Sequence, residues 1–215
     1  HTWTDLEGNR YAALGTSKGL YIYYEDKFYD ITPLATALTS ATFTSTNGSN
    51  TVTVNKTSHA LDVGEYVTFT SVTLPGGGAT GFTVANFQDF TYEVLTVPNA
   101  NSFTIQMKTN ESGSGMTAAG SASINPYEEI GPTIQTYGYG WGTSTWSRGT
   151  WGSGTTSSTV ILDPGSWSLD NFGEQLIATI KDGKTFVWNP GVSNPLEQRA
   201  VIMSGAPTAT RLTIT

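Results

Sequence analysis

One pattern of residues occurs twice in this chain of 215 residues, and it limits the possible folds more than any other feature. Each copy has a tryptophan, a glycine, an apolar stretch, a glycine turn and then an aromatic stretch. The first copy comprises Trp3, Gly8, Tyr11-Ala12-Ala13, Gly19 and Leu20-Tyr21-Ile22, and the second comprises Trp167, Gly173, Leu176-Ile177-Ala178, Asp182-Gly183 and Phe186-Val187-Trp188. The tryptophan and the first glycine are five residues apart in one copy and six in the other. The same two-strand layout is therefore expected near both ends of the chain.

The repeat predicts antiparallel blades of the kind that build β-propellers, in which short strands are joined by tight turns. In the first copy, strands are expected at 11–16, 20–24 and 28–31, and Pro33 ends the last of them. Two copies, even with a third opening at 206–214, cannot close a ring of about four to eight blades. We therefore expect either that the chain is part of a longer protein or that neighbouring subunits complete the sheet.

The composition agrees with an all-β fold. The chain has 24 Gly, 9 Pro, 10 Tyr, 9 Phe and 6 Trp, and only 13% of its residues are charged. Helical domains usually carry more Glu, Lys, Ala and Leu on their solvent-facing sides, whereas strands and turns favour the residues found here. We therefore predict an all-β fold of antiparallel propeller-like blades, interrupted by an inserted module.

The inserted module is expected at 39–126, where the sequence becomes rich in Thr, Ser, Asn and Gly. Its strands are predicted at roughly 51–56, 65–70, 91–97 and 102–107. Alternation of polar and apolar residues in these segments favours a small β-barrel or sandwich with one buried face per strand. The flanking segments are a first blade segment at 1–38 and a Gly/Trp loop with returning blade segments at 127–215, and these two are expected to form one domain.

Charge and cysteine content exclude several functions. The formal net charge is −7 with ten Lys and Arg residues and no basic cluster, so the chain is poorly suited to gripping nucleic acid. No cysteine is present, which excludes disulfides, thiolate metal sites and cysteine nucleophiles. No apolar run is long enough to span a bilayer. The first residue is His1 rather than Met, which favours an excerpt of a longer chain.

Paired carboxylates are a possible catalytic feature, because glycoside hydrolases need only two of them. The candidates are Glu128, Glu129, Asp163, Asp170 and Glu174. Adjacent residues of a strand point to opposite faces, so Glu128 and Glu129 are not expected to act as a pair. The aspartate and glutamate after Trp167 are expected to be turn and capping groups, and no catalytic residue is predicted.

Metal binding is not predicted either. The chain has two histidines, and His59 has no second histidine or cysteine nearby with which to form an ordinary metal site. It is expected to hold a turn between two strands. Calcium could in principle use oxygen-rich turns around Asp26, Asp30 and Asp182, but their spacing lacks a dense, regular Asp pattern. No metal or other cofactor is therefore expected.

The most distinctive stretch is a loop rich in glycine and aromatic residues. Its candidate contact residues are Tyr139, Trp141, Trp146, Arg148 and Trp151. Flat aromatic rings on a Gly/Ser/Thr backbone suit stacking on sugar rings, and the arginine could add a cation–π contact. The same residues are also enriched at protein interfaces, and this packing or assembly role is the favoured interpretation. Stacking on nucleobases is the weakest option, because the chain is acidic.

Three stretches resemble phage tail proteins. The order from Trp3 to Pro33 resembles the opening blade of phage tail-tube proteins, and the stretch from Trp167 to Ala178 is similar to a further blade. The family that these stretches resemble is the nozzle, or tail tubular, protein of short-tailed phages. Residues 51–69 resemble a small β module found in phage structural proteins. Nozzle proteins are much longer than this chain, which is a further reason to expect an excerpt.

The resemblance implies a non-enzymatic virion protein of the phage tail. It implies assembly with copies of itself into a ring, contact with neighbouring tail proteins, and passage of DNA without specific binding. An acidic wall would let phosphates slide past. The alternative is a carbohydrate-binding or receptor-binding module of a tail that recognises a host-surface glycan, and a glycoside hydrolase is the third possibility.

Overall fold

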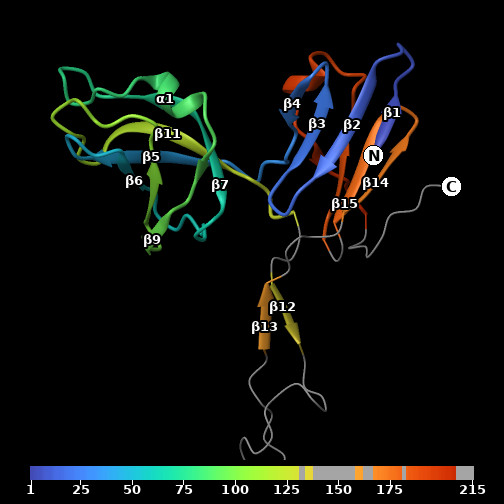
Figure 1. The fold of residues 1–215 in the computed structure, drawn as a ribbon. Helices are drawn as coiled ribbons and strands as arrows, with labels where there is room; N and C mark the ends of the chain where they lie inside the picture. The colour runs from blue at the N-terminus through green and yellow to red at the C-terminus, as the bar shows by residue number, and fades with distance from the viewer. Residues whose placement is uncertain (131–133, 138–157, 162–166, 181–182, 207–215) are drawn as a thin grey trace, which may run out of the picture. The chain divides into compact units, whose positions relative to one another are not determined.

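The computed structural model describes residues 1–130, 134–137, 158–161, 167–180 and 183–206, which form two compact units (Figure 1). The first unit comprises His1–Pro33 and Glu129–Thr215, and the second comprises Leu34–Glu128. Each unit is described separately below. The regular secondary structure of the described residues is almost entirely β-strand, with one short α-helix, so the predicted all-β class is confirmed. Among these residues, no helix has the length and apolar character needed to cross a membrane.

The first unit contains two four-stranded antiparallel sheets. One has the order β1-β2-β3-β4, formed by β1 (Thr2–Thr4), β2 (Arg10–Gly15), β3 (Leu20–Tyr24) and β4 (Lys27–Asp30). The other has the order β14-β15-β16-β17, formed by β14 (Trp167–Phe172), β15 (Gln175–Ile180), β16 (Thr185–Trp188) and β17 (Val201–Ile202). A 3₁₀ turn at Pro195–Glu197 precedes β17, and a separate two-stranded ladder joins β12 (Ile134–Tyr137) to β13 (Ser158–Ile161).

The two sheets place the repeated residues at equivalent positions. Trp3 lies in β1 and Trp167 in β14, the first strand of each sheet. Gly8 and Gly173 follow in the next turns with φ values of 92° and 59°, a backbone conformation that glycine adopts without the steric cost of a Cβ. In the first sheet alternate residues of β2 and β3 are buried, because successive strand residues face opposite sides. In the second sheet β15 is buried without a break from Leu176 to Ile180.

One hydrophobic core lies between the two sheets. Both sheets contribute to it, with Trp3, Tyr11, Ala13, Leu20, Ile22, Leu176, Ala178, Phe186 and Trp188, and Ile31, Ile130 and Ala200 join from segments outside the strands. Hydrogen bonds also join the sheets, since the Trp3 indole donates to the Glu174 carbonyl at 3.0 Å and the Trp167 indole donates to the Thr16 carbonyl at 2.8 Å. The repeat thus produces a pair of sheets packed face to face. Within the described residues this pair does not close into a ring, so a propeller remains a prediction.

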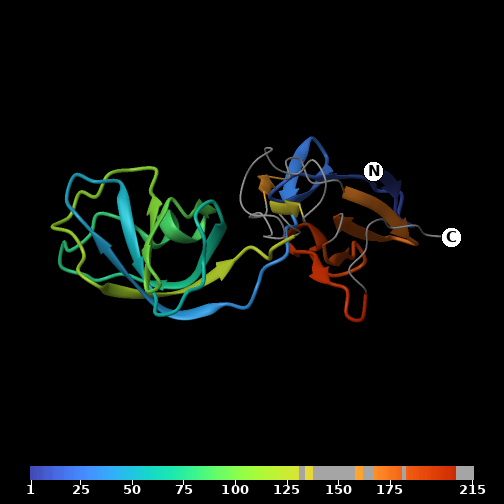
Figure 2. The ribbon, with the colours of Figure 1, turned by 90° about the horizontal axis from the view of Figure 1, so that it is seen from below.

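The second unit is a seven-stranded antiparallel sheet that curls around its own core. Its strands are β5 (Leu38–Ser45), β6 (Thr51–Asn55), β7 (Tyr66–Thr73), β8 (Tyr92–Glu93), β9 (Thr96–Asn99), β10 (Ser102–Gln106) and β11 (Ala119–Pro126), in the order β8-β7-β11-β5-β6-β10-β9. The two end strands of the sheet, β8 and β9, are separated in the chain by only Val94 and Leu95. The sheet must therefore curl for both ends to pair, as Figure 2 shows. It is a half-barrel, which is closer to the predicted barrel than to a sandwich.

A short helix, α1 (Val84–Gln88), completes the core of the second unit. Thr83 caps its first turn, and Thr83 and Asn86 exchange side-chain-to-backbone hydrogen bonds in a capping box. The helix buries Phe87, whose ring centroid lies 4.4 Å from that of Phe43 and 6.1 Å from that of Phe69. All the buried core residues of this unit lie between positions 41 and 124, so the unit has a core of its own.

Candidate functional site

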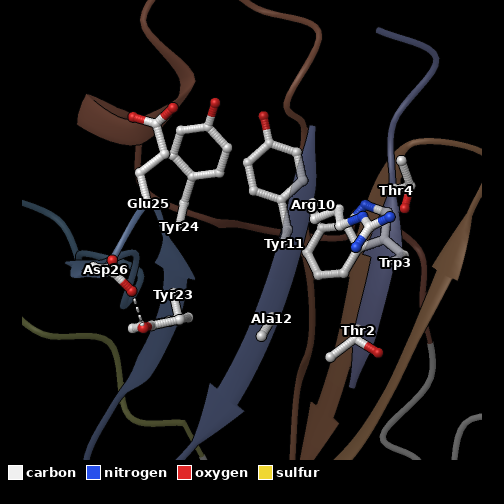
Figure 3. A pocket seen from close by; sticks show the side chains of 10 residues that line it. All are labelled: Thr2, Trp3, Thr4, Arg10, Tyr11, Ala12, Tyr23, Tyr24, Glu25 and Asp26. Carbon is white, nitrogen blue, oxygen red and sulfur yellow. Dashed lines mark hydrogen bonds between the residues drawn. The ribbon is translucent and has the colours of Figure 1, made fainter. Parts of the chain in front are cut away.

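An open groove lies over β1, β2, β3 and the turn that follows β3, all within the first unit (Figure 3). Its volume is about 440 Å³, within the ~300–1,000 Å³ range of small-molecule sites. Its lining includes Thr2, Thr4, Arg10, Ala12, Tyr23 and Asp26.

The strand register explains why the groove is hollow. Thr2 pairs with Ala12, and Ala12 pairs with Tyr23, so these three residues form one row across the sheet on the side away from the core. Two small side chains therefore lie beside a large aromatic one. The row continues to Phe28 on β4, whose ring centroid is 4.9 Å from that of Tyr23. The result is a floor of small residues with an aromatic wall.

Polar groups are positioned around this floor. The Tyr23 hydroxyl donates a 2.8 Å hydrogen bond to Oδ1 of Asp26. This hydrogen bond and the charge of the Asp26 carboxylate raise the pKa of Tyr23, so the hydroxyl stays protonated. Arg10 is exposed, and among the described residues no hydrogen bond or ion pair engages its guanidinium. The groove therefore offers a free cationic donor and a fixed carboxylate acceptor.

The carboxylates at the groove come from a strained turn. Glu25 and Asp26 form the two-residue turn between β3 and β4, with φ values of 46° and 60°. Two-residue hairpins favour this left-handed backbone, but they usually achieve it with Asn-Gly or Asp-Gly. A glutamate and an aspartate in these positions are unfavourable for the turn itself. Their presence places two acidic side chains at one end of the groove.

A row of aromatic residues supports the groove from the core side of the sheet. Trp3, Tyr11 and Tyr24 lie side by side on β1, β2 and β3, with ring centroids 5.4 Å and 5.0 Å apart. Trp188 of the second sheet packs its ring edge-on against Trp3 and Tyr11. Burial, followed by the nearby Asp5 carboxylate, raises the pKa of Tyr11 to about 12. The sheet beneath the groove is thus backed by a rigid, neutral aromatic layer.

The predicted contact residues of the Gly/Trp loop lie outside the described residues. These are Tyr139, Trp141, Trp146, Arg148 and Trp151. Asp163 and Asp182 also lie outside them. The structure therefore leaves the role predicted for the loop as a prediction.

His59 has a structural position. The backbone N–H of Leu61 donates to its Nδ1 at 3.0 Å, and its Nε2 lies 3.2 Å from the carbonyl oxygen of Asn99. With Nδ1 accepting from Leu61, Nε2 is placed to donate to the Asn99 carbonyl. The ring is buried and packs edge-on against Phe103. His59 therefore holds the turn before β7, which is the position that the sequence predicted for it.

Three of the carboxylates that the sequence singled out make structural contacts in the first unit. Asp30 forms an ion pair with Arg199 at 3.1 Å, and Arg199 also donates to the carbonyl of Thr32. Glu174 accepts a hydrogen bond from the backbone of Leu6 at 2.8 Å. Asp170 accepts from the backbone N–H of Asn171 and lies near His1. Among the described residues, no group of three or more His, Cys, Asp or Glu side chains is arranged to hold a metal ion.

The sequence did not point to the groove, and the reason is its geometry. Thr2, Ala12 and Tyr23 come together only through the pairing of three strands, and nothing in their spacing along the chain marks them. The one local signal is Glu25-Asp26, an acidic pair in a two-residue hairpin where Asn-Gly is usual.

Comparisons with known proteins give little to add. No protein family model matches the chain, and no curated protein matches it. Among solved structures, the chain is similar to a protein described as "Phage phi92 endosialidase", with 13% sequence identity and a TM-score of 0.35. The similarity covers 90% of this chain and 30% of that protein, so the chain spans less than a third of its length.

Proposed function

We propose that the chain is a non-enzymatic structural component of a phage tail, in the wall of a nozzle or tube that assembles as a ring of copies. The stretches that resemble nozzle blades are the two that form equivalent four-stranded sheets, starting at Trp3 and at Trp167. In such a ring, each chain would contact copies of itself and neighbouring tail proteins. DNA would pass through without being held, which suits a net charge of −7.

The observation that carries the proposal is the apolar outer edge of the second sheet. β17 is an end strand that pairs only with β16 within that sheet, and the side chain of Val201 is 63% exposed. Ile202 and Met203 beside it are also exposed. Soluble proteins usually protect such edges with charged residues or proline, because an unpaired edge recruits another strand. An apolar end strand with no further strand beside it among the described residues is what a sheet completed by a second copy needs.

The contacts of the carboxylates support the absence of catalysis in this proposal. Asp30 and Glu174 use their oxygens to hold backbone and arginine groups of the first unit. A general acid or nucleophile needs a carboxylate free to face a substrate. We propose accordingly that the chain has no enzymatic activity.

Light scattering on a sizing column, followed by negative-stain imaging of the same peak, tests the assembly. We expect discrete rings of fixed copy number for the full chain. Val201→Lys should shift the peak toward monomer, because a charge on the edge opposes strand pairing. Val63→Lys is the matched control, since Val63 is 64% exposed but lies in the second unit, and its rings should persist. A full chain that stays monomeric at high concentration would contradict the proposal. Rings that persist unchanged in Val201→Lys would contradict it too.

A further inference from the structure

We infer that the groove over β1, β2 and β3 is a binding site for a neutral glycan, a function separate from assembly. An aromatic wall is the first reason. The ring of Tyr23 is 36% exposed at the edge of a floor formed by Thr2 and Ala12, and Phe28 packs against it. Apolar faces of pyranose rings stack on aromatic rings positioned in this way. The small floor leaves room for a sugar ring beside the tyrosine.

The second reason is the set of donors and acceptors around that floor. Arg10 offers a guanidinium that no described residue engages, and Thr2 and Thr4 offer hydroxyls. Asp26 offers a carboxylate whose position is fixed by the 2.8 Å hydrogen bond from Tyr23. Neighbouring hydroxyls of a sugar act as donors and acceptors at once, so they can satisfy a carboxylate and a guanidinium together.

The charges around the groove favour a neutral glycan over an anionic one. The charged residues that line the groove are one cation, Arg10, and two anions, Glu25 and Asp26, and the carboxylates of Asp5 and Glu7 also act on the lining residue Tyr11. The groove is therefore acidic, as is the whole chain. An anionic sugar would gain one guanidinium contact but face two carboxylates and an overall negative field. A neutral, hydroxyl-rich oligosaccharide meets no such repulsion.

The third reason is that the site is held rigidly before any ligand arrives. The stacked row of Trp3, Tyr11 and Tyr24 fixes the sheet from the core side. Pre-ordered sites lose less entropy on binding, which matters for weak ligands such as sugars. The strained Glu25-Asp26 turn keeps the acidic side chains at one end of the groove. A glycine or asparagine would suit this turn better, so the sequence retains these residues at a cost in stability.

The test uses the full chain and defined oligosaccharides. Maltohexaose and cellohexaose serve as neutral probes, and a sialic acid oligomer serves as the anionic probe. Saturation-transfer NMR and calorimetric titration should give a Kd of about 1 mM for at least one neutral probe, and binding about tenfold weaker or absent for the anionic one. Ala12→Phe fills the floor and should abolish binding.

Asp26→Gly separates binding from folding. Glycine relieves the left-handed strain at this position, so the melting temperature should rise by about 2–4 °C. The loss of the carboxylate should nevertheless weaken the binding of the neutral probe by about tenfold. A variant that is more stable but binds less well cannot owe its loss of binding to unfolding.

Two control variants should keep wild-type binding. Phe172→Ala removes an aromatic ring as exposed as that of Phe28, 65% in both cases, but away from the groove. Replacement of Trp141, Trp146 and Trp151 by Ala removes the competing aromatic loop. Saturable binding with this pattern of losses supports the groove.

Other results would overturn the inference. The inference fails if neither neutral probe binds at a concentration about ten times the expected Kd. It also fails on wild-type affinity in Ala12→Phe, or on loss of binding only in the variant without the three tryptophans, which would move the site to the loop. If Ala12→Phe breaks up rings while Asp26→Gly binds the probes normally, the face is a contact between copies and not a glycan site.

Discussion

At the scale of single residues, Glu111 has the most demanding environment in the second unit. Its side chain is buried, and Oε2 accepts hydrogen bonds from the hydroxyls of Ser45 and Thr80 at 2.7 and 2.8 Å. Oε1 accepts from the backbone N–H groups of Gly81 and Gly113 at 2.5 and 2.9 Å. A single carboxylate thus joins β5 to two loops that are distant in sequence. Burial alone would raise the pKa of Glu111, but the four hydrogen bonds together lower it below its ordinary value.

This environment predicts an acid-sensitive second unit. Because the pKa of Glu111 is lowered in the folded state, the ionised carboxylate stabilises the fold above its ordinary pKa of 4.5. That stability should be lost as the pH falls from there through the folded-state pKa. Glu111→Gln should cost about 1–3 kcal/mol at pH 7, because charge-assisted hydrogen bonds are lost. Urea unfolding followed from neutral to acidic pH measures both effects.

The decisive comparison is how the unfolding free energies of the wild type and of Glu111→Gln change with pH. The cost of Glu111→Gln should shrink on acidification, since the wild-type carboxyl also becomes neutral. Glu65→Gln is a suitable control in the same unit, because Glu65 caps an exposed turn through Asp62. A cost for Glu111→Gln that stays constant down to acidic pH would show that its charge does not stabilise the fold.

At the scale of elements, the packing of the two sheets of the first unit depends on a close approach at Gly15. A Cβ added to Gly15, at the end of β2, would lie 2.3 Å from Cγ of the Trp167 indole. The same indole donates its N–H to the carbonyl of Thr16. Any larger residue at this position would clash with the indole, so glycine is needed here. The close contact packs β14 against the turn after β2.

Gly15→Ala should destabilise the first unit by about 1–3 kcal/mol, because the indole must move and its hydrogen bond must stretch. The measurement is thermal unfolding followed by near-ultraviolet circular dichroism, which reports the tryptophan environment. Gly191→Ala is the control in the same unit, since its added Cβ would come no closer than 3.3 Å to the flexible side chain of Asn189. Equal effects of the two substitutions would contradict the proposed role of Gly15.

The sequence predicted elements best where their pairing is local. The expected strands at 11–16, 20–24 and 28–31 correspond to β2, β3 and β4, each joined to the next by a short turn. The missed elements include β1, β5, β11, β14, β17 and α1. β5 and β11 are rich in Ser, Thr and Ala and pair with each other across a long stretch of chain, so their strength lies in partners that the local pattern does not reveal.

The candidate site was harder to predict than the strands. The groove depends on a register that places Ala12 between Thr2 and Tyr23, and a shift by one residue would turn those side chains toward the core. Hydrophobic alternation indicates which face of a strand is buried, but it does not fix the neighbours in the next strand. The sequence therefore predicted the aromatic residues of β3 without their role as a wall.

At the scale of the whole molecule, the second unit begins and ends at neighbouring points. Leu34 and Tyr127 form a β-bridge, and the N–H of Ala35 donates to the carbonyl of Pro126 at 2.8 Å. Adjacent ends allow a module to be inserted into another domain without separating the strands on either side. The buried core of this unit also draws on none of the residues of the first.

Residues 34–128 expressed alone should therefore fold into the same half-barrel. We expect a single cooperative unfolding transition, because the excised segment keeps the complete core and all seven strands. Phe87→Ala provides the quantitative check, since this fully buried ring should contribute about 3–5 kcal/mol. Its cost should be the same in the excised unit and in the full chain, because distant and independent regions contribute additively. A smaller cost in the excised unit, or gradual unfolding without a cooperative transition, would mean that the first unit helps to hold the half-barrel together.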